Sequence, residues 1–264
     1  MAHANDKIVA QVDDGIGRFT INNAAKRNCM SLAMWKRMGD VFETWAEDPA
    51  VRVIIVRGAG DACFCAGNDI SEFAVLRSSP GSIDAYSAVT DRAYAHVRNI
   101  PKPTIARISG FCIGGGLEIA QLCDIQIAGE TATFGVTPAK LGLGYKLDDV
   151  ALLTANVSAK AAKEILFTGR RFPASDALRW GLVNRVTADQ DLDDTVEAYA
   201  REIAANAPLS VKAAKVIVGE AVKETAARDA GACQTLVDAC HASEDYIEGQ
   251  RAFAEKRAPQ FKGR

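Results

Sequence analysis

The residues best suited to chemistry lie in one glycine-rich stretch, residues 109–118, which ends in a carboxylate. The stretch follows a strand-like run and opens an apolar helix, so Gly114, Gly115 and Gly116 stand at a strand-to-helix junction. Glycine lets the backbone turn sharply there and lets a ligand approach bare amide groups. The first N–H groups of a helix have no intrahelical partner and carry the positive end of the helix dipole. This junction can therefore hold a negatively charged oxygen, with Glu118 within one turn to move a proton.

A purely structural interpretation of the same stretch is equally open at this point. The three glycines permit close helix packing, and Glu118 complements the positive helix N-terminus. A second small-residue loop, residues 65–68, favours the chemical interpretation because it also follows a β-rich segment. Backbone amides from two separate loops can converge on one oxygen as an oxyanion hole, which fits carbonyl chemistry. The sequence contains neither a P-loop pattern nor a Gly-x-Gly-x-x-Gly pattern, so a nucleotide site has no support.

The composition excludes several classes of function. Thirty-one basic and 33 acidic residues give a net charge of −2, which argues against a nucleic-acid or membrane-surface role. The seven cysteines are an odd number without zinc or redox spacing, and the three histidines are scattered. We therefore expect no disulfide framework, no metal site and no Ser-His-Asp triad. Residues 1–7 lack the apolar core of a signal peptide, so we expect a soluble, cytoplasmic protein.

The patterning predicts strand–helix units followed by an all-helical tail. Strands are expected at 8–12, 16–21, 51–56, 104–108, 124–128, 133–135 and 182–186. Helices are expected at 31–47, 82–99, 117–122, 147–156, 159–167, 174–181, 192–206, 209–222, 226–241 and 243–257. This order of elements predicts an α/β fold with a helical C-terminal part.

Ordered motifs along nearly the whole chain resemble the crotonase superfamily, also called the enoyl-CoA hydratase/isomerase superfamily. They lie at residues 22–28, 64–70, 101–103, 109–118, 123–124, 134–135, 168–170, 177–183 and 252–257. The resemblance implies a spiral of repeated ββα units over residues 1–191, which would bind acyl-CoA and carry out catalysis. It also implies that residues 192–264 form a helical oligomerisation segment, and that the protein assembles as a trimer or a dimer of trimers.

The resemblance further implies a CoA thioester substrate, as in fatty-acid metabolism, with no metal and no cofactor beyond the CoA of the substrate. The N–H groups of Asn68 and Gly115 would bind the thioester oxygen and stabilise an enolate. Residues that match CoA contacts are Lys26, Arg27, Ala66, Asp69 and Ile70, joined by Phe253 and Lys256 from C-terminal helices, often those of a neighbouring subunit. The basic residues among them also suit solvated charges, and the apolar ones suit packing positions.

One departure from the family pattern concerns the acid/base groups. Glu118 matches the first of two glutamates that typical hydratases use, but Pro138 stands at the position of the second. Proline cannot transfer a proton, so we expect Glu118 to act as the single acid/base group. Hydration by Glu118 alone and double-bond isomerisation both remain open.

The residues around Pro138 resemble the corresponding loop of methylmalonyl-CoA decarboxylases. In that branch the residues matching Glu118, Thr137 and Tyr145 surround the substrate carboxylate, and decarboxylation yields the same enolate. A malonyl-CoA-type or methylmalonyl-CoA-type decarboxylase is therefore one alternative, although those enzymes carry histidine where this chain has Asn68. Tyr145 also suits a half-buried tyrosine with its hydroxyl in water. A non-catalytic acyl-CoA binder is the other alternative.

Overall fold

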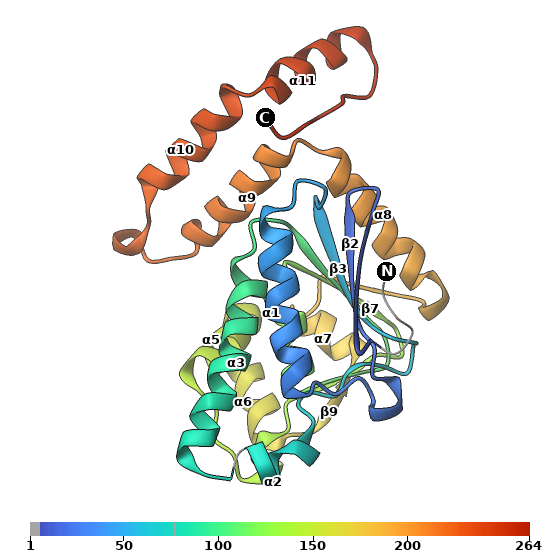
Figure 1. Ribbon diagram of the computed structural model, residues 1–264, viewed down its shortest axis with the longest axis vertical. Coiled ribbons are helices and arrows are strands. Elements are labelled where there is room, and N and C mark those ends of the chain that lie inside the picture. Colours follow the sequence, from blue (N-terminus) through green and yellow to red (C-terminus); the bar gives the residue numbers. More distant parts are fainter. Residues whose placement is uncertain (1–5, 77) are drawn as a thin grey trace.

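The computed structural model describes residues 6–76 and 78–264, and this chain alternates between two β-sheets (Figure 1). Most of the N-terminal segment considered above, residues 1–5, lies outside the described residues. The larger sheet has the order β1 (Ile8–Asp13), β2 (Ile16–Ile21), β3 (Val53–Gly58), β5 (Thr104–Ile108), β7 (Ile125–Gly129), β10 (Arg185–Thr187). The smaller sheet has the order β4 (Cys63–Cys65), β6 (Phe111–Ile113), β8 (Thr133–Gly135), β9 (Arg171–Pro173).

The chain repeats one unit: a strand in the larger sheet, a strand in the smaller sheet, then helix. The helices are α1 (Leu32–Glu47), α2 (Phe73–Leu76), α3 (Pro80–Asn99), α4 (Gly115–Leu122), α5 (Leu147–Asn156), α6 (Ala159–Thr168), α7 (Ala174–Trp180), α8 (Leu192–Ala205), α9 (Pro208–Ala221), α10 (Ala230–His241) and α11 (Glu244–Glu255). Thus β3 and β4 lead to α2 and α3, β5 and β6 lead to α4, and β7 and β8 lead to α5 and α6. This order confirms the predicted α/β spiral of ββα units. Within the described residues, no helix is both long and apolar enough to span a membrane.

Strand β3 explains how the layers are held together, because both of its faces are buried. Successive side chains of a strand point to opposite faces. Ile54 and Val56 join the large core cluster that also contains residues of α1, α3 and α4. Val53 and Ile55 join a second cluster on the other face of the sheet. Burying each such side chain contributes about 1.5–3 kcal/mol, so β3 fastens helices to both faces.

Helix α8 supplies the cover on that second face. Its buried side chains recur at helical spacing and belong to the same cluster as Val53 and Ile55; they are Leu192, Val196, Ala200 and Ala204. Glu197 of α8 accepts two hydrogen bonds from Arg18 of β2, at 2.9 and 2.7 Å. By its packing, α8 therefore belongs with the sheets, whereas the sequence grouped it with the segment 192–264.

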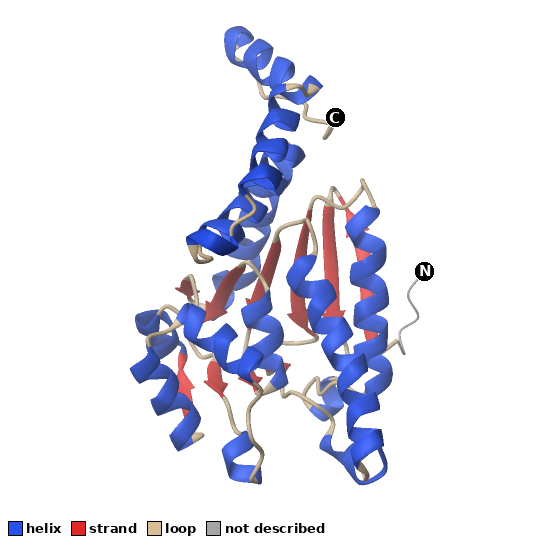
Figure 2. Ribbon diagram, turned by 90° about the vertical axis from the view of Figure 1, so that its left-hand side faces the viewer, coloured by secondary structure: helices blue, strands red, loops and turns tan. Residues whose placement is uncertain are grey.

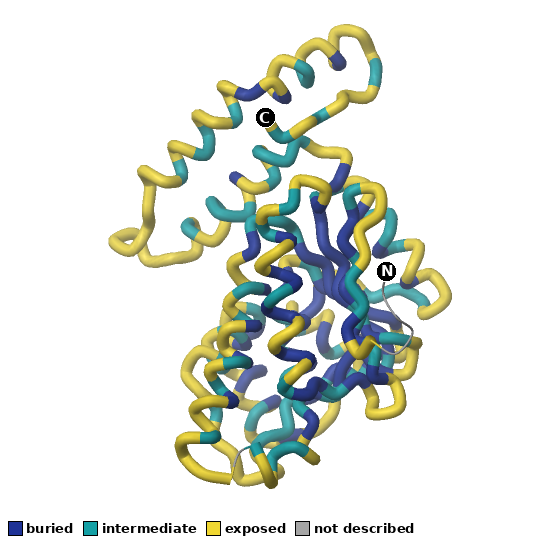
Figure 3. The backbone as a smooth tube through the Cα atoms, in the orientation of Figure 1, coloured by how far each residue is buried: buried dark blue, intermediate teal, exposed yellow. Residues whose placement is uncertain are grey.

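The helices after α8 project from the rest of the subunit (Figures 1 and 2). Among the described residues of α10 none is buried, and most residues of α10 and α11 are exposed (Figure 3). Arg52, next to β3, anchors the base of this projection by donating to the carbonyls of Ala204 and Phe261, at 2.9 and 2.6 Å. The projecting part thus begins at Pro208, where proline starts α9.

Candidate active site

Two loops meet at the centre of the subunit, one after β4 and one after β6. A Cβ added to Gly67 would lie 3.1 Å from the backbone N of Gly115 and 3.1 Å from the carbonyl oxygen of Ile113. A Cβ added to Gly116 would lie 2.2 Å from the carbonyl oxygen of Cys65, which no side chain can tolerate. Glycine at both positions therefore permits the approach of the two backbones.

This approach places the two predicted amide donors, Asn68 and Gly115, beside each other. The loop after β4 is fixed by main-chain hydrogen bonds from Met30 N to Gly67 O, at 2.8 Å, and from Asp69 N to Met30 O, at 2.9 Å. These bonds flank Asn68 and leave its own N–H out of the pairing. Gly115 is the first residue of α4, where helical N–H groups lack a partner. Among the hydrogen bonds of residues 6–76 and 78–264, none involves the N–H of Asn68 or of Gly115.

The side chain of Asn68 fixes its loop instead of serving as a free polar group. Its Oδ1 accepts a hydrogen bond from Trp35 Nε1, at 2.8 Å, and one from the Tyr86 hydroxyl, at 3.1 Å. Trp35 belongs to α1 and Tyr86 to α3, and both are buried. Two helices thereby hold the Asn68 backbone in place.

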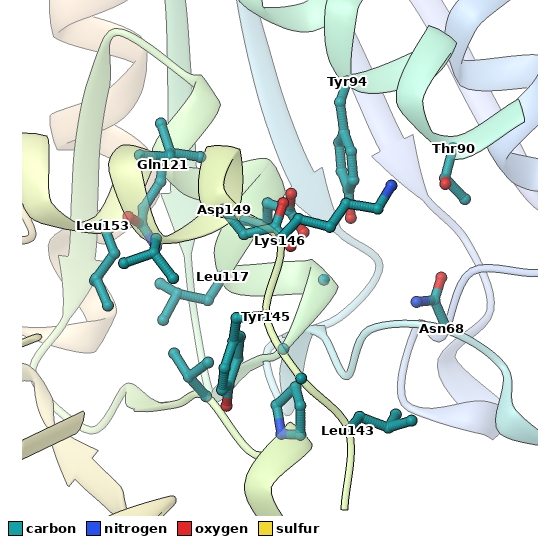
Figure 4. A pocket seen from close by; sticks show the side chains of 18 of the residues that line it. Asn68, Thr90, Tyr94, Leu117, Gln121, Leu143, Tyr145, Lys146, Asp149 and Leu153 are labelled. Atoms are coloured by element: carbon teal, nitrogen blue, oxygen red, sulfur yellow. The ribbon is translucent and has the colours of Figure 1, made fainter. Parts of the chain in front are cut away.

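Asn68 and Gly115 border a cavity of about 250 Å³ between α3, α4 and α5 (Figure 4). Gln121 lines this cavity, and its buried Oε1 makes no hydrogen bond. Buried polar atoms nearly always have partners, so an unpaired oxygen here marks a place where a polar ligand or water binds.

Glu118 also lines the cavity, from the first turn of α4. Burial, followed by the negative charge of Asp149, raises the pKa of Glu118 from 4.5 to about 8. A hydrogen bond with Tyr94 acts in the opposite direction, while a hydrogen bond with Asp149 and the charge of Asp91 raise the pKa further. Glu118 is therefore mainly protonated at neutral pH and can donate a proton.

Two further charged groups of the cavity, Lys146 and Asp91, form an ion pair between neighbouring elements. Lys146, the residue before α5, donates to both carboxylate oxygens of Asp91 on α3, each at 2.9 Å. In Figure 4 the Tyr94 hydroxyl and the Asp149 carboxylate point toward the middle of the cavity, close to the Lys146 chain. The lining thus carries three carboxyl groups and one ammonium group that is already paired.

The loop before α5 contributes Pro138 and Tyr145 to the lining, but not Thr137. In Figure 4 the Tyr145 hydroxyl points away from Asp149 and Tyr94. Burial raises the pKa of Tyr145. The structure therefore brings Glu118, Asn68, Gly115 and the Tyr145 ring to one cavity, with the Tyr145 hydroxyl outside the group around Glu118.

Comparison with known proteins now identifies the family. Residues 11–264 match the family described as enoyl-CoA hydratase/isomerase. The chain belongs to the enoyl-CoA hydratase/isomerase family. It is thus an acyl-CoA enzyme of the crotonase superfamily, as the sequence motifs predicted.

Relatives and solved structures of this family cover almost the whole chain. Carnitinyl-CoA dehydratase of Proteus mirabilis is 36% identical over 247 residues, covering 90% of this chain and 92% of the relative. Carnitinyl-CoA dehydratase of Escherichia coli K12 is 35% identical over 246 residues, with the same coverage of 90% and 92%. The structure of an enoyl-CoA hydratase/carnithine racemase from Magnetospirillum magneticum superimposes with a TM-score of 0.92 at 35% identity, covering 99% and 97% of the two chains. Enoyl-CoA hydratase from Bacillus anthracis gives a TM-score of 0.89 at 28% identity, covering 98% and 100%.

Five of the seven residues that match CoA contacts in this family gather near the Asn68 loop. Lys26 Nζ lies 2.7 Å from Asp69 Oδ2, and the hydrogen bonds from Lys26 and Ser71 lower the pKa of Asp69 to about 2. Ala66 N donates to the carbonyl oxygen of Arg27 at 3.1 Å. Ile70 is 64% exposed, so its side chain is not packed in the hydrophobic core.

The other two family matches, Phe253 and Lys256, lie on α11 and at its C-terminal end. Both are exposed, and Phe253 is 88% exposed. Figures 1 and 2 place α11 at the opposite end of the subunit from α2 and the adjoining end of α3. Neither residue lines the cavity of its own chain.

Sequence patterns did not identify Tyr94 and Asp149, whose side chains hydrogen-bond to Glu118. Tyr94 lies within an ordinary amphipathic helix, and its position carries no local signal. Asp149 follows Asp148 in the first turn of α5, where acidic residues are common for reasons of helix polarity. Only the fold shows that residue 149 meets residue 118.

Among the described residues, no group of histidine, cysteine, aspartate and glutamate side chains is arranged to hold a metal ion.

Proposed function

We propose that this enzyme adds water to, or removes water from, the Cα–Cβ bond of an acyl-CoA thioester through an enolate. The observation that carries the proposal is the pairing of two unbonded amides, of Asn68 and Gly115, with a protonated Glu118 at one cavity. The relatives named carnitinyl-CoA dehydratase support a dehydration chemistry for this chain.

In the proposed mechanism the thioester oxygen accepts hydrogen bonds from both amides. Negative charge that develops on this oxygen is stabilised by the two N–H groups and by the positive end of α4. Losing one such donor typically slows a reaction by about 10²–10³-fold. Glu118 transfers a proton to or from the reacting part of the acyl group, because it lies within the same helical turn as Gly115.

Decarboxylation is less well supported by the lining of the cavity. A malonyl-type substrate would bring another carboxylate toward Asp91 and Asp149. Like charges about 4 Å apart repel by about 4 kcal/mol at an effective dielectric constant of about 20. Lys146 is already paired with Asp91, and the Tyr145 hydroxyl points elsewhere in Figure 4. Isomerisation uses the same enolate and remains compatible with Glu118.

A substrate panel with one variant tests the proposal. Purified protein is incubated with crotonyl-CoA, 3-hydroxybutyryl-CoA, carnitinyl-CoA, a 3-enoyl-CoA and methylmalonyl-CoA, and products are followed by mass spectrometry. We expect gain or loss of water with at least one thioester, and a fall in turnover of about 10²–10⁴-fold in Glu118→Gln. The dissociation constant of a CoA ester should stay nearly unchanged in that variant.

Three outcomes would contradict the proposal. Binding without any product from the whole panel would indicate the non-catalytic acyl-CoA binder. Loss of carbon dioxide from methylmalonyl-CoA as the only reaction would indicate the decarboxylase, and unchanged turnover in Glu118→Gln would remove Glu118 from the mechanism.

The proposal extends to the CoA moiety. Lys26, Arg27, Ala66, Asp69 and Ile70 would line its path beside the Asn68 loop. Phe253 and Lys256 would reach CoA from a neighbouring copy in a trimer or a dimer of trimers.

A further inference from the structure

The cavity holds a second carboxyl group against Glu118 that the sequence motifs do not predict. Glu118 comes from the first turn of α4, and Asp149 comes from the first turn of α5. The two side chains line the same cavity and are joined by a hydrogen bond. Two carboxyl groups in contact hold a proton between them, because both cannot be ionised at that distance without strong repulsion.

We propose that Asp149 is the second catalytic carboxyl group of this enzyme, sharing a proton with Glu118 and replacing the glutamate that Pro138 displaces. This inference rests on the proposed dehydration and hydration chemistry. Asp149 is the group that accepts the α-proton of the substrate, and Glu118 is the group that donates to the leaving hydroxyl.

The proton balance of dehydration follows from these roles. Asp149, ionised, takes the proton from the α-carbon, and the electron pair of the C–H bond forms the enolate. The enolate collapses to the enoyl thioester as the C–O bond at the β-carbon breaks, and the departing hydroxyl takes the proton of Glu118 to leave as water. Glu118 is then ionised and Asp149 protonated, and the proton returns along the hydrogen bond between them. Hydration is the same sequence in reverse.

Other acidic side chains near the cavity do not fit this role. Asp91 faces Glu118 from α3, but both of its oxygens accept from Lys146 Nζ at 2.9 Å. Asp148 stands next to Asp149 in the chain but is exposed and absent from the lining. Tyr94 faces Glu118 as well, yet its pKa is raised well above 10 by burial, so its hydroxyl does not act as a base at neutral pH.

The matched pair Asp149→Asn and Asp148→Asn tests the proposal in the intact protein. Both variants remove one negative charge from the same helical turn, and only the first lies in the cavity. We expect Asp149→Asn to lower turnover by about 10²-fold or more, and to slow exchange of the substrate α-proton with deuterium oxide to the same extent. Asp148→Asn should stay within about twofold of the wild type. If Asp149→Asn exchanged the substrate α-proton at the wild-type rate, the proposal would be overturned.

A titration that needs no substrate provides the second readout. Carbon-13 NMR of protein labelled at the glutamate carboxyl carbon follows Glu118, with the resonance assigned by Glu118→Gln. We expect the titration midpoint of Glu118 to fall in Asp149→Asn and to stay in place in Asp148→Asn. An unchanged midpoint in Asp149→Asn would show that no proton is shared. This result is independent of the substrate panel, so failure of the proposed reaction and failure of the carboxyl pair can be told apart.

Discussion

At position 118 the protein holds a carboxyl group in its protonated form by placing it among groups that oppose its charge. Burial is the largest cause, and the negative charge of Asp149 comes next. Tyr94 counteracts both by hydrogen bonding to the carboxylate. An acid that must donate at neutral pH works best when its pKa lies near the working pH, and a value of about 8 meets that condition.

The hydrogen bond from Tyr94 can be removed separately from the rest of the site. Tyr94→Phe takes away the interaction that lowers the pKa of Glu118, so that pKa should rise. In the proposed dehydration the active form of Glu118 is protonated, so activity should be lost as pH rises through its pKa. We therefore expect the alkaline limb of the pH profile of kcat/KM to move to higher pH in Tyr94→Phe, with turnover lowered about tenfold or more.

Tyr86→Phe is the matched control, because Tyr86 lies on the same helix and hydrogen-bonds to Asn68 Oδ1 at 3.1 Å. It should leave the alkaline limb in place while it weakens the support of the Asn68 loop. A shift to lower pH in Tyr94→Phe would contradict the stated role of Tyr94.

Glu118 should also make the stability of the folded protein depend on pH. Its pKa is about 8 in the folded protein against an ordinary value of 4.5, so the folded state binds the extra proton between these values. The free energy of unfolding therefore falls as pH rises through this window, by about 1.4 kcal/mol per pH unit. Glu118→Gln lacks this proton, so the variant should gain stability relative to wild type from about pH 5 to pH 8. Urea unfolding at several pH values measures the difference, and a constant difference would contradict the prediction.

The residues of the site differ in how far the sequence revealed them. Gly115 and Glu118 were predicted because their types and spacing carry local meaning at a helix start. Asp149 was not, because its contact with Glu118 joins two helices that are separated by more than 20 residues along the chain. The sequence pattern of a carboxylate in a first helical turn is the same whether the side chain faces solvent or another carboxylate.

At the scale of elements, the close approach of α4 to β4 is what aligns the two amides. Gly116→Ala would place a Cβ 2.2 Å from the carbonyl oxygen of Cys65, and neither backbone can yield without moving the junction. We expect a loss of about 1–3 kcal/mol of stability, or more, together with a fall in turnover because Gly115 and Asn68 separate. Thermal unfolding and steady-state kinetics measure the two effects.

Gly81→Ala is the matched control for this prediction. Gly81 lies near the start of α3, and a Cβ there would meet nothing within 4 Å. Stability should stay the same or rise by up to about 1 kcal/mol, with normal turnover. A Gly116→Ala variant that behaves like Gly81→Ala would show that the junction has more room than its geometry implies.

The sequence predicted where helices and strands lie better than it predicted which other elements they pair with or pack against. The hairpin at the N-terminus, the central strands and the long helices were expected where they occur, because their hydrophobic periods are strong. Strand β9 was not expected, since Arg171–Pro173 has no strand pattern of its own and is extended by pairing with β8. The amphipathic pattern of α8 predicted a helix but not its partner, which is the face of the sheet formed by Val53 and Ile55.

At the scale of the whole molecule, the projecting helices α9 to α11 carry apolar side chains that their own subunit leaves exposed. Phe253 is 88% and Val222 is 82% exposed, and Ile247 and Val218 are also exposed. A protrusion with so much apolar surface is typical of a region that another chain covers. In the proposed trimer or dimer of trimers, these helices would bring Phe253 and Lys256 to the CoA site of a neighbouring copy.

Assembly through these helices yields a prediction that joins stability of the oligomer to substrate binding. Phe253→Asp combined with Val222→Asp should convert a trimer or a dimer of trimers into monomers, because buried contacts between copies would then contain charges. The fold of the subunit should persist, since both side chains are exposed within it. The KM for the CoA ester should rise in the monomer, because Phe253 and Lys256 of the neighbour are lost from the CoA path.

The matched control is Val75→Asp on α2, which is 75% exposed and lies at the other end of the subunit (Figure 1). Light scattering should give the wild-type mass for this control. A wild-type protein that is itself monomeric would contradict both the proposed assembly and the shared CoA site.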